Sequence, residues 1–388
     1  MNTYIRLSTF TIGLLSLVAP TALVQAQPPA THELRVVSPQ VENDGSVLFQ
    51  LVAPNAKSVS LDSPDLGGMP NPGEMTKSAE GVWSLKYGPV TPAIAMRYRF
   101  KVDGVDFADP SARGTSEANG TVFSLVVIPG AEFEDTQKVA HGAIAEVNYY
   151  STVLGRFRRL HVYTPPGYQK GQNTYPVLYL LHGSSDSDDS WGTVGRANDI
   201  LDNLIAAGKA VPMIVVMPDG HVTRAGVPNT SGGTFEDEFA RDIRPMIEKT
   251  YRVDLDRAHR AIAGLSMGGA QTMSIAFSNL ADFGYIGVFS SGIFPPRPGV
   301  PGAQGPNWEE RHMAALDDAA LKPGLQLIWF ATGRDDFLIK TSRDTVGVLR
   351  KHGFQVQFTE TDGAHWWKNW RGYLHDFAPL LFQPTAKN

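Results

Sequence analysis

The hydrophobic pattern changes character along the 388 residues of the chain. In residues 35–127, apolar and polar positions alternate in short runs, separated by turns rich in glycine, asparagine and proline. Such alternation is typical of half-buried antiparallel strands. The expected strands are 46–52, 58–62, 81–87, 96–102 and 122–127. The pattern therefore predicts a small all-β sandwich over residues 33–128.

The hydrophobic pattern changes near residue 141. The preceding segment, 129–140, contains proline, glycine and charged residues, and we interpret it as a linker. Near-continuous apolar runs alternate with amphipathic helical patterns, which indicates a mostly parallel sheet covered on both faces. The expected strands are 143–147, 158–163, 177–181, 213–217, 261–263, 286–289, 325–331 and 354–359, and the expected helices are 196–207, 234–251, 270–279, 338–351 and 373–382. Residues 141–385 are thus predicted to form an α/β domain, whose ligand site would lie beyond the carboxyl ends of the strands.

The first 26 residues have the pattern of a secretory signal peptide. Arg6 is their only charged side chain, an apolar run follows over residues 10–23, and small residues precede an expected cleavage site before Gln27. No later stretch is apolar enough to span a bilayer, so the mature protein is expected to be secreted or periplasmic. The chain has no cysteine, which excludes a disulfide framework and thiol chemistry.

Composition and charge exclude several classes of partner and cofactor. A net charge of −5 gives no electrostatic case for binding nucleic acid or an anionic membrane. Asp186, Asp188 and Asp189 lack the spacing and the glutamate of a calcium-binding EF-hand, so they are expected in a solvated loop. No HExxH or phosphate-binding loop is present either, and no metal or cofactor is expected.

One segment carries a nucleophile signature. An apolar run, 261–263, leads into Gly264-Leu265-Ser266-Met267-Gly268, and a helical pattern follows. A strand, a sharp turn and a helix place the central residue in a strained conformation with its side chain exposed, while the flanking glycines let strand and helix approach. Ser266 is therefore the predicted nucleophile. The competing explanation is a Ser/Gly-rich turn without chemistry.

A serine nucleophile requires a base and an acid that orients the base. In α/β hydrolases both follow the serine at the ends of later strands. Only His365 among the later histidines closely follows an expected strand, so it is the predicted base. The preceding strand, 325–331, leads to Asp335 and Asp336, and spacing alone does not separate these two candidates. The alternative for the pair is a helix N-cap.

The oxyanion of the tetrahedral intermediate needs two backbone N–H donors. Met267, which follows the nucleophile, is expected to supply one. The loop after strand 177–181 has the sequence His182-Gly183-Ser184-Ser185, and Ser184 is the expected second donor. His182 precedes the nucleophile and directly ends its strand, so we expect a buried, hydrogen-bonded support rather than a second base.

The motifs YLLHG, GRANDILDNLIAAGK, GLSMGGAQT, GRDDFLI and GAHWW resemble those of esterase D-like carbohydrate esterases, in particular bacterial feruloyl and acetylxylan esterases. The resemblance covers most of residues 139–382 and implies an α/β-hydrolase fold with Asp336 as the orienting acid. Residues 35–127, with LVAPNAKSVSL, GVWSL and YRFKVDGVDFADP, are similar to the Ig-like early-set modules that precede such esterases and glycogen-branching enzymes. Many of those modules are described as carbohydrate-binding, whereas some only pack against the catalytic domain.

The resemblance implies a serine esterase that cleaves feruloyl or acetyl esters of plant cell-wall polysaccharide. Several aromatic residues near the catalytic loops are candidates for stacking on an acyl ring or a sugar, and core packing is the alternative for each: Trp191, Phe294, Trp308, Trp366, Trp367 and Trp370. A siderophore esterase is a competing possibility, although no Lys/Arg cluster flanks the predicted site. A further alternative is an inactive, exported carbohydrate-binding protein. The acyl group, the polysaccharide and the oligomeric state are left open.

Overall fold

The computed structural model describes residues 34–65, 73–92, 94–223, 234–294 and 306–383. The predicted signal peptide and its cleavage site lie outside these residues. Within them, no helix is both long and apolar enough to cross a membrane. Val36–Asn388 form one compact unit, which contains both the all-β region and the α/β region and does not divide at residues 129–140.

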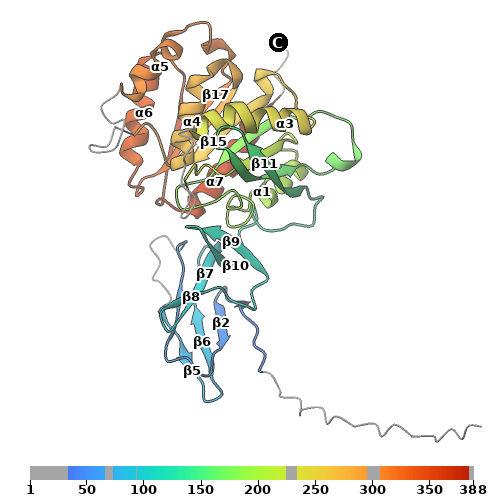
Figure 1. Ribbon diagram of the computed structural model, residues 1–388, viewed down its shortest axis with the longest axis vertical. Helices are drawn as coiled ribbons and strands as arrows, with labels where there is room; N and C mark the ends of the chain where they lie inside the picture. Colours follow the sequence, from blue (N-terminus) through green and yellow to red (C-terminus); the bar gives the residue numbers. More distant parts are fainter. Residues whose placement is uncertain (1–33, 66–72, 93, 224–233, 295–305, 384–388) are drawn as a thin grey trace, which may run out of the picture. The chain divides into compact units, whose positions relative to one another are not determined.

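The all-β region consists of two antiparallel sheets (Figure 1). One has the order β1-β2-β6-β5, and the other has the order β4-β3-β7-β10-β9 with β8 paired to β7. The strands are β1 Gln40–Val41, β2 Val47–Val52, β3 Val59–Asp62, β4 Gly73–Glu74, β5 Thr76–Lys77, β6 Val82–Tyr87, β7 Ala95–Val102, β8 Val105–Phe107, β9 Gly114–Ala118 and β10 Thr121–Val127.

Alternation along these strands gives the two sheets a common core. Phe49 of β2 and Tyr98 of β7 are fully buried, and their ring centroids are 4.7 Å apart. The five strands predicted from alternation are present with ends within about one residue. The strands that the pattern missed have two to five residues, too few for a periodic signal. That this region is an Ig-like early-set module stays a prediction.

The α/β region contains an eight-stranded sheet with the order β11-β12-β14-β13-β15-β16-β17-β18. β11 and β12 form an antiparallel hairpin, β12 pairs antiparallel with β14, and the remaining pairs are parallel. The mostly parallel sheet expected from the apolar runs is confirmed. The strands are β11 Ala143–Ser151, β12 Arg156–Thr164, β13 Val177–Leu181, β14 Ile214–Pro218, β15 Arg260–Leu265, β16 Tyr285–Phe289, β17 Leu327–Gly333 and β18 Gln357–Thr361.

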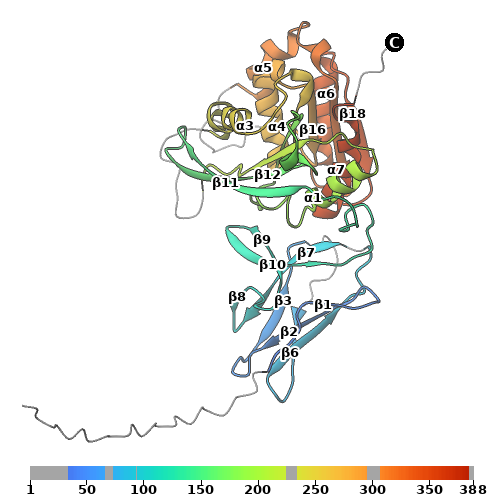
Figure 2. The same cartoon turned by 90° about the vertical axis from the view of Figure 1, so that its right-hand side faces the viewer.

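Helices cover both faces of this sheet (Figures 1 and 2). Side chains on one face pack against α3 Arg244–Thr250, α4 Met267–Ser278, α5 Trp308–Asp317 and α6 Ile339–Lys351. Side chains on the other face pack against α1 Ala197–Ala206 and α7 Trp367–Phe377. The central strands are buried on both sides, and for this reason they read as continuous apolar runs.

The helices differ most from the sequence prediction in three segments. α7 begins at Trp367, six residues before the expected start at 373. The buried face of this helix already begins at Trp367. The segment expected as one helix over 234–251 contains α2 Phe235–Glu238, a π-helical turn and α3. α5 was not predicted, although Asn307 and Glu310 form a capping box that marks its start.

The predicted linker packs onto the α/β region. Glu134 is buried and forms an ion pair with Arg371 of α7, and the Thr136 hydroxyl donates to the Asp199 carboxylate of α1 at 2.8 Å. Residues 129–140 contain no helix or strand, as expected from their composition.

Candidate active site

Ser266 occupies the sharp turn between β15 and α4. Its backbone has φ 50° and ψ −117°, a region that non-glycine residues rarely adopt. A Cβ atom at Gly264 would lie 2.4 Å from the carbonyl carbon of Gly268, and one at Gly268 would lie 2.4 Å from the His182 carbonyl oxygen. Both glycines are therefore required by close backbone packing, which is why the motif tolerates no side chain there.

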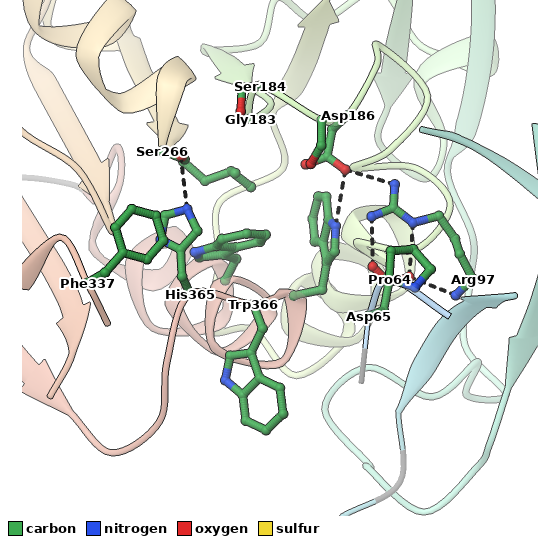
Figure 3. A pocket seen from close by; sticks show the side chains of 14 residues that line it. Pro64, Asp65, Arg97, Gly183, Ser184, Asp186, Ser266, Phe337, His365 and Trp366 are labelled. Carbon is green, nitrogen blue, oxygen red and sulfur yellow. Dashed lines mark hydrogen bonds and ion pairs between the residues drawn. The ribbon is translucent and has the colours of Figure 1, made fainter. Parts of the chain in front are cut away.

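The structure brings Ser266, His365 and Asp336 together, and the contact between Ser266 and His365 is shown in Figure 3. The Nε2 atom of His365 lies 3.0 Å from Ser266 Oγ. Its Nδ1 atom lies 3.0 and 3.1 Å from the two carboxylate oxygens of Asp336. This arrangement lets the imidazole take a proton from the hydroxyl while the carboxylate holds the ring.

Asp335 and Asp336 differ in their surroundings. Asp335 is exposed, whereas Asp336 is 2% exposed and faces the imidazole. Burial alone would raise the pKa of Asp336, but hydrogen bonding and charge from His365 outweigh it and keep the pKa below its usual value. Asp336 also accepts a hydrogen bond from the Leu338 N–H at 2.8 Å, next to the start of α6. Asp336 therefore faces the imidazole, and the side-chain N-cap considered as the alternative is not formed, because the N-cap residue of α6 is Leu338 and has no side-chain cap hydrogen bond.

The two expected oxyanion donors lie on either side of the nucleophile. Met267 is the first residue of α4, and Ser184 follows Gly183 in the loop after β13. A Cβ atom at Gly183 would lie 2.7 Å from Leu265 Cδ1 and 3.5 Å from Ser266 Cβ, so this loop passes directly beside the nucleophile. His182 is buried; its Nδ1 donates to the Gly183 carbonyl at 2.7 Å and its Nε2 accepts from the Gly220 N–H at 2.9 Å.

Two cavities meet at Ser266, and both are also lined by Ser184 and Phe337. The histidine-side cavity, about 230 Å³, is lined by further residues that include Asp65, Arg97, Asp186, His365, Trp366, Trp367 and Trp370. The helix-side cavity, about 450 Å³, is lined by further residues that include Met267, Ala270, Gln271, Ser274, Phe294 and Leu338. An ester bound at Ser266 can therefore extend in two directions.

The aromatic candidates divide into two groups. Trp366 and Trp367 line the histidine-side cavity, and Phe294 lines the helix-side cavity. For Trp191 and Trp308 the prediction of a substrate contact is wrong, because both are core residues that line neither cavity. Trp191 is 1% exposed and donates from Nε1 to the Leu181 carbonyl, and Trp308 is 6% exposed and packs on Phe277.

Several residues of the site were not identified from the sequence. Asp65 and Arg97 belong to the all-β region, and no local motif connects them with Ser266, which lies more than 150 residues later in the chain. Phe337 is 74% exposed, and its ring centroid lies 4.5 Å from that of His365. The sequence signal that could have identified Phe337 is that it directly follows Asp336, because residues next to a catalytic acid often lie at the rim of the active site.

The expectation of a solvated loop at residues 186–189 is wrong. Asp186 and Asp188 are 5% and 3% exposed, and both form ion pairs with arginines. A run of aspartates looks solvated in sequence because the cations that neutralise it, Arg97 and Arg159, come from distant strands.

Among the residues that the structure describes, two groups of side chains have the composition of metal ligands: His182, Asp219 and His221, and Asp254, Asp256 and His259. In the first group both nitrogens of His182 are already hydrogen-bonded, and Asp219 is paired with Arg158. The second group is partly exposed, and exposed acidic groups commonly occur without an ion. Neither group includes Ser266, His365 or Asp336.

The family model described as "Putative esterase" matches residues 151–380, more than half of the chain. The chain belongs to this esterase family. The fold and the esterase family expected from the motifs are confirmed.

Individual relatives agree with this assignment. An endo-1,4-beta-xylanase/feruloyl esterase of Xylanibacter ruminicola is 33% identical over 359 residues, which is 89% of this chain and 46% of that protein. An acetyl esterase of Caldicellulosiruptor saccharolyticus is 24% identical over 60% of this chain and 95% of its own length. A solved ferulic acid esterase has a TM-score of 0.53 at 28% identity and covers 63% of this chain and 98% of that structure. The chain spans about half the length of the Xylanibacter relative.

Proposed function

We propose that the protein is a serine carboxylesterase that forms an acyl-enzyme on Ser266. The observation that carries the proposal is the continuous hydrogen-bonded arrangement from Ser266 Oγ through His365 to Asp336, located where two cavities meet. The strained backbone of Ser266 further supports it, since such strain persists mainly at functional sites.

In this mechanism Ser266 Oγ attacks the ester carbonyl carbon while its proton passes to Nε2 of His365. The carbonyl oxygen becomes an oxyanion, which the N–H groups of Met267 and Ser184 stabilise. As the tetrahedral intermediate collapses, the C–O bond to the alcohol breaks and His365 returns the proton to the leaving oxygen. Water, activated by the same imidazole, then attacks the acyl-enzyme, and the acid and Ser266 are released.

The position of His365 assigns the two parts of the ester to the two cavities. The leaving alcohol must lie on the side from which it receives its proton, and His365 lines only one of the cavities. The alcohol therefore extends into the histidine-side cavity, with its tryptophans and charged side chains. The acyl group extends into the helix-side cavity, with Ala270, Phe294 and Phe337.

The substrates proposed are feruloyl or acetyl esters of plant cell-wall polysaccharide, cleaved outside the cytoplasm. The names of the feruloyl and acetyl esterase relatives support both acyl groups. The larger, partly aromatic helix-side cavity favours a planar hydroxycinnamoyl group. Tryptophans beside the leaving group suit a sugar ring, and the signal-peptide pattern of residues 1–26 suits an exported enzyme.

The charges of the histidine-side cavity argue against a trianionic siderophore ester. Arg97 is the arginine of that lining, but it is already paired with Asp65 and Asp186. The two carboxylates outnumber the guanidinium, so this wall offers a polyanion no net attraction.

The test is Ser266→Ala assayed on methyl ferulate. We expect kcat/KM to fall by about 10⁴-fold or more with the fold unchanged by circular dichroism. Retained turnover would exclude the acyl-enzyme on Ser266. Assaying wild type in parallel on 4-nitrophenyl acetate, a feruloylated arabinoxylan oligosaccharide and a catecholate siderophore ester then separates the substrate classes.

A further inference from the structure

The loop that contains Ser184, residues 183–193, is hydrogen-bonded along its length to the all-β region. The Asn119 N–H donates to the carbonyl oxygen of Ser185 at 2.8 Å, directly beside Ser184. Farther along, the Glu117 N–H donates to the Asp189 carboxylate at 2.9 Å, and the hydroxyl groups of Ser116 and Thr193 are 2.7 Å apart. The 183–193 loop is thus fixed from outside the sheet that carries the nucleophile.

Arg97 makes the most buried of these connections (Figure 3). Its Nη1 donates to Asp186 at 2.8 Å, while Nε and Nη2 donate to the two oxygens of the Asp65 carboxylate at 2.9 and 2.8 Å. The three side chains are 2–3% exposed. Buried charges of this kind hold their partners in one geometry, because separating them leaves an unpaired charge out of water.

Asp186 transmits this restraint to Ser184. The Asp186 N–H donates to the Gly183 carbonyl oxygen at 3.2 Å, closing a tight turn over Ser184 and Ser185. Both serines at the tip of the turn are exposed, so packing within the α/β region does not fix them. The turn is instead connected to the all-β region through the two residues that follow Ser184: Ser185 accepts from Asn119, and Asp186 accepts from Arg97.

A second ion-pair bridge supports the same loop. Arg159 of β12 donates to Asp188 at 2.8 Å from two of its nitrogens, and also to Glu117 of β9 at 2.8 Å. The loop therefore meets the all-β region through two arginines, one from each region.

We propose that the all-β region is a positioning element for the oxyanion hole, and that Arg97 is its principal positioning residue. The inference rests on the proposed function, because it requires that the Ser184 N–H stabilise the oxyanion. In this arrangement the all-β region contributes to the rate of the chemical step even for an ester that has no sugar. A loop displaced by about 1 Å would hold the donor away from the oxyanion, which typically costs about a hundredfold in rate.

The experiment compares Arg97→Met with Arg99→Met in the full chain. Arg99 lies on the same strand, β7, and pairs with Asp62 and Asp106, so its substitution removes ion pairs of the same strand that are more exposed and do not touch the 183–193 loop. The substrate is 4-nitrophenyl acetate, whose small leaving group has no sugar to contact Arg97. For Arg97→Met we expect kcat to fall about 10- to 100-fold with KM within about twofold, and for Arg99→Met both to stay within about twofold.

Inhibitor binding distinguishes positioning from a general loss of structure. An aryl trifluoromethyl ketone forms an oxyanion-bearing adduct with the nucleophile, whereas free ferulate binds without one. In Arg97→Met the inhibition constant of the ketone should rise in parallel with the loss of kcat/KM, while that of ferulate stays unchanged. Arg97→Lys keeps the positive charge but not the planar guanidinium that bonds to both carboxylates. It should recover part of the lost kcat/KM.

Three results would overturn the proposal: an unchanged kcat, a higher KM with unchanged kcat, or equal weakening of ketone and ferulate. The second result would mean that Arg97 contacts substrate directly. If Arg97→Met does not fold, Asp65→Asn, which leaves the arginine in place, is the second variant. It should lower kcat about 3- to 10-fold, again with little change in KM. These outcomes are independent of Ser266→Ala, so a failure of the inference leaves the proposed nucleophile standing.

Discussion

The two cavities that meet at Ser266 are built in different ways. The helix-side cavity is lined by α4 and by the segments that flank it in the α/β region, and its walls include Ala270, Phe294 and Phe337. The histidine-side cavity takes part of its wall from the all-β region, with Asp65 and Arg97 facing the tryptophans of α7. One half of the candidate ester site is thus lined by the α/β region alone, whereas the lining of the other half depends on a second region.

The largest effect is expected at the proposed catalytic centre, where the two cavities meet at Ser266. Asp336→Asn should lower kcat by about 10³- to 10⁴-fold on feruloyl and acetyl esters alike, because the imidazole loses the partner that orients it and stabilises its charge. Steady-state kinetics on both esters measures this. Asp335→Asn is the matched control, since Asp335 is exposed, and it should keep kcat within about threefold. Equal losses in the two variants would contradict the assignment of the acid.

A change confined to the helix-side cavity should distinguish acyl groups. Ala270→Trp fills the space beside Ser266. We expect kcat/KM for methyl ferulate to fall about 100-fold while that for 4-nitrophenyl acetate stays within about threefold, because only the large acyl group needs the volume. Parallel kinetics on the two esters provides the measurement. Equal effects on both would break the assignment of this cavity to the acyl group.

A change confined to the histidine-side cavity should distinguish alcohols. Trp366→Ala should raise KM for a feruloylated arabinoxylan oligosaccharide about 10-fold and leave methyl ferulate within about threefold, because only the oligosaccharide reaches the indole. Phe157→Ala is the control, since Phe157 is an exposed aromatic residue, 76% exposed, that lines neither cavity. If KM for methyl ferulate rises as much as KM for the oligosaccharide, the alcohol does not lie in the histidine-side cavity.

The smallest effect concerns the stability of the 183–193 loop in acid. Burial alone would raise the pKa of Asp188, but hydrogen bonds from His161 and Arg159 outweigh it and hold the pKa below its usual value. Since the folded-state pKa lies below the unfolded one, this contribution to the free energy of unfolding is complete above pH about 4 and is lost as the pH falls through the folded-state pKa.

Asp188→Asn should therefore lower the free energy of unfolding at pH 7 and flatten its decline in acid. Urea unfolding between pH 7 and 3 measures both quantities. An unchanged acid slope would show that the Asp188 carboxylate is not stabilised by its partners in the folded state.

Local pattern in the sequence determined most of the fold and the centre of the candidate site. Continuous apolar runs predicted the central parallel strands because each of these is buried on both faces, and alternation predicted the longer strands of the all-β region. The glycines around Ser266 are required by contacts within one strand–turn–helix unit, so the turn could be recognised without its surroundings. His365 and the aspartate pair followed from their places after successive strands.

Tertiary structure alone decided which groups surround that centre. It placed Asp336 rather than Asp335 against the imidazole, buried Trp191 and Trp308 in the core, and joined Arg97 to Asp186 across 89 residues of chain. Such outcomes depend on which face of the folded chain meets which neighbour, and no periodicity encodes that. A charged side chain can be buried only beside a partner of opposite charge, and the partner of a loop aspartate was supplied here by a distant strand.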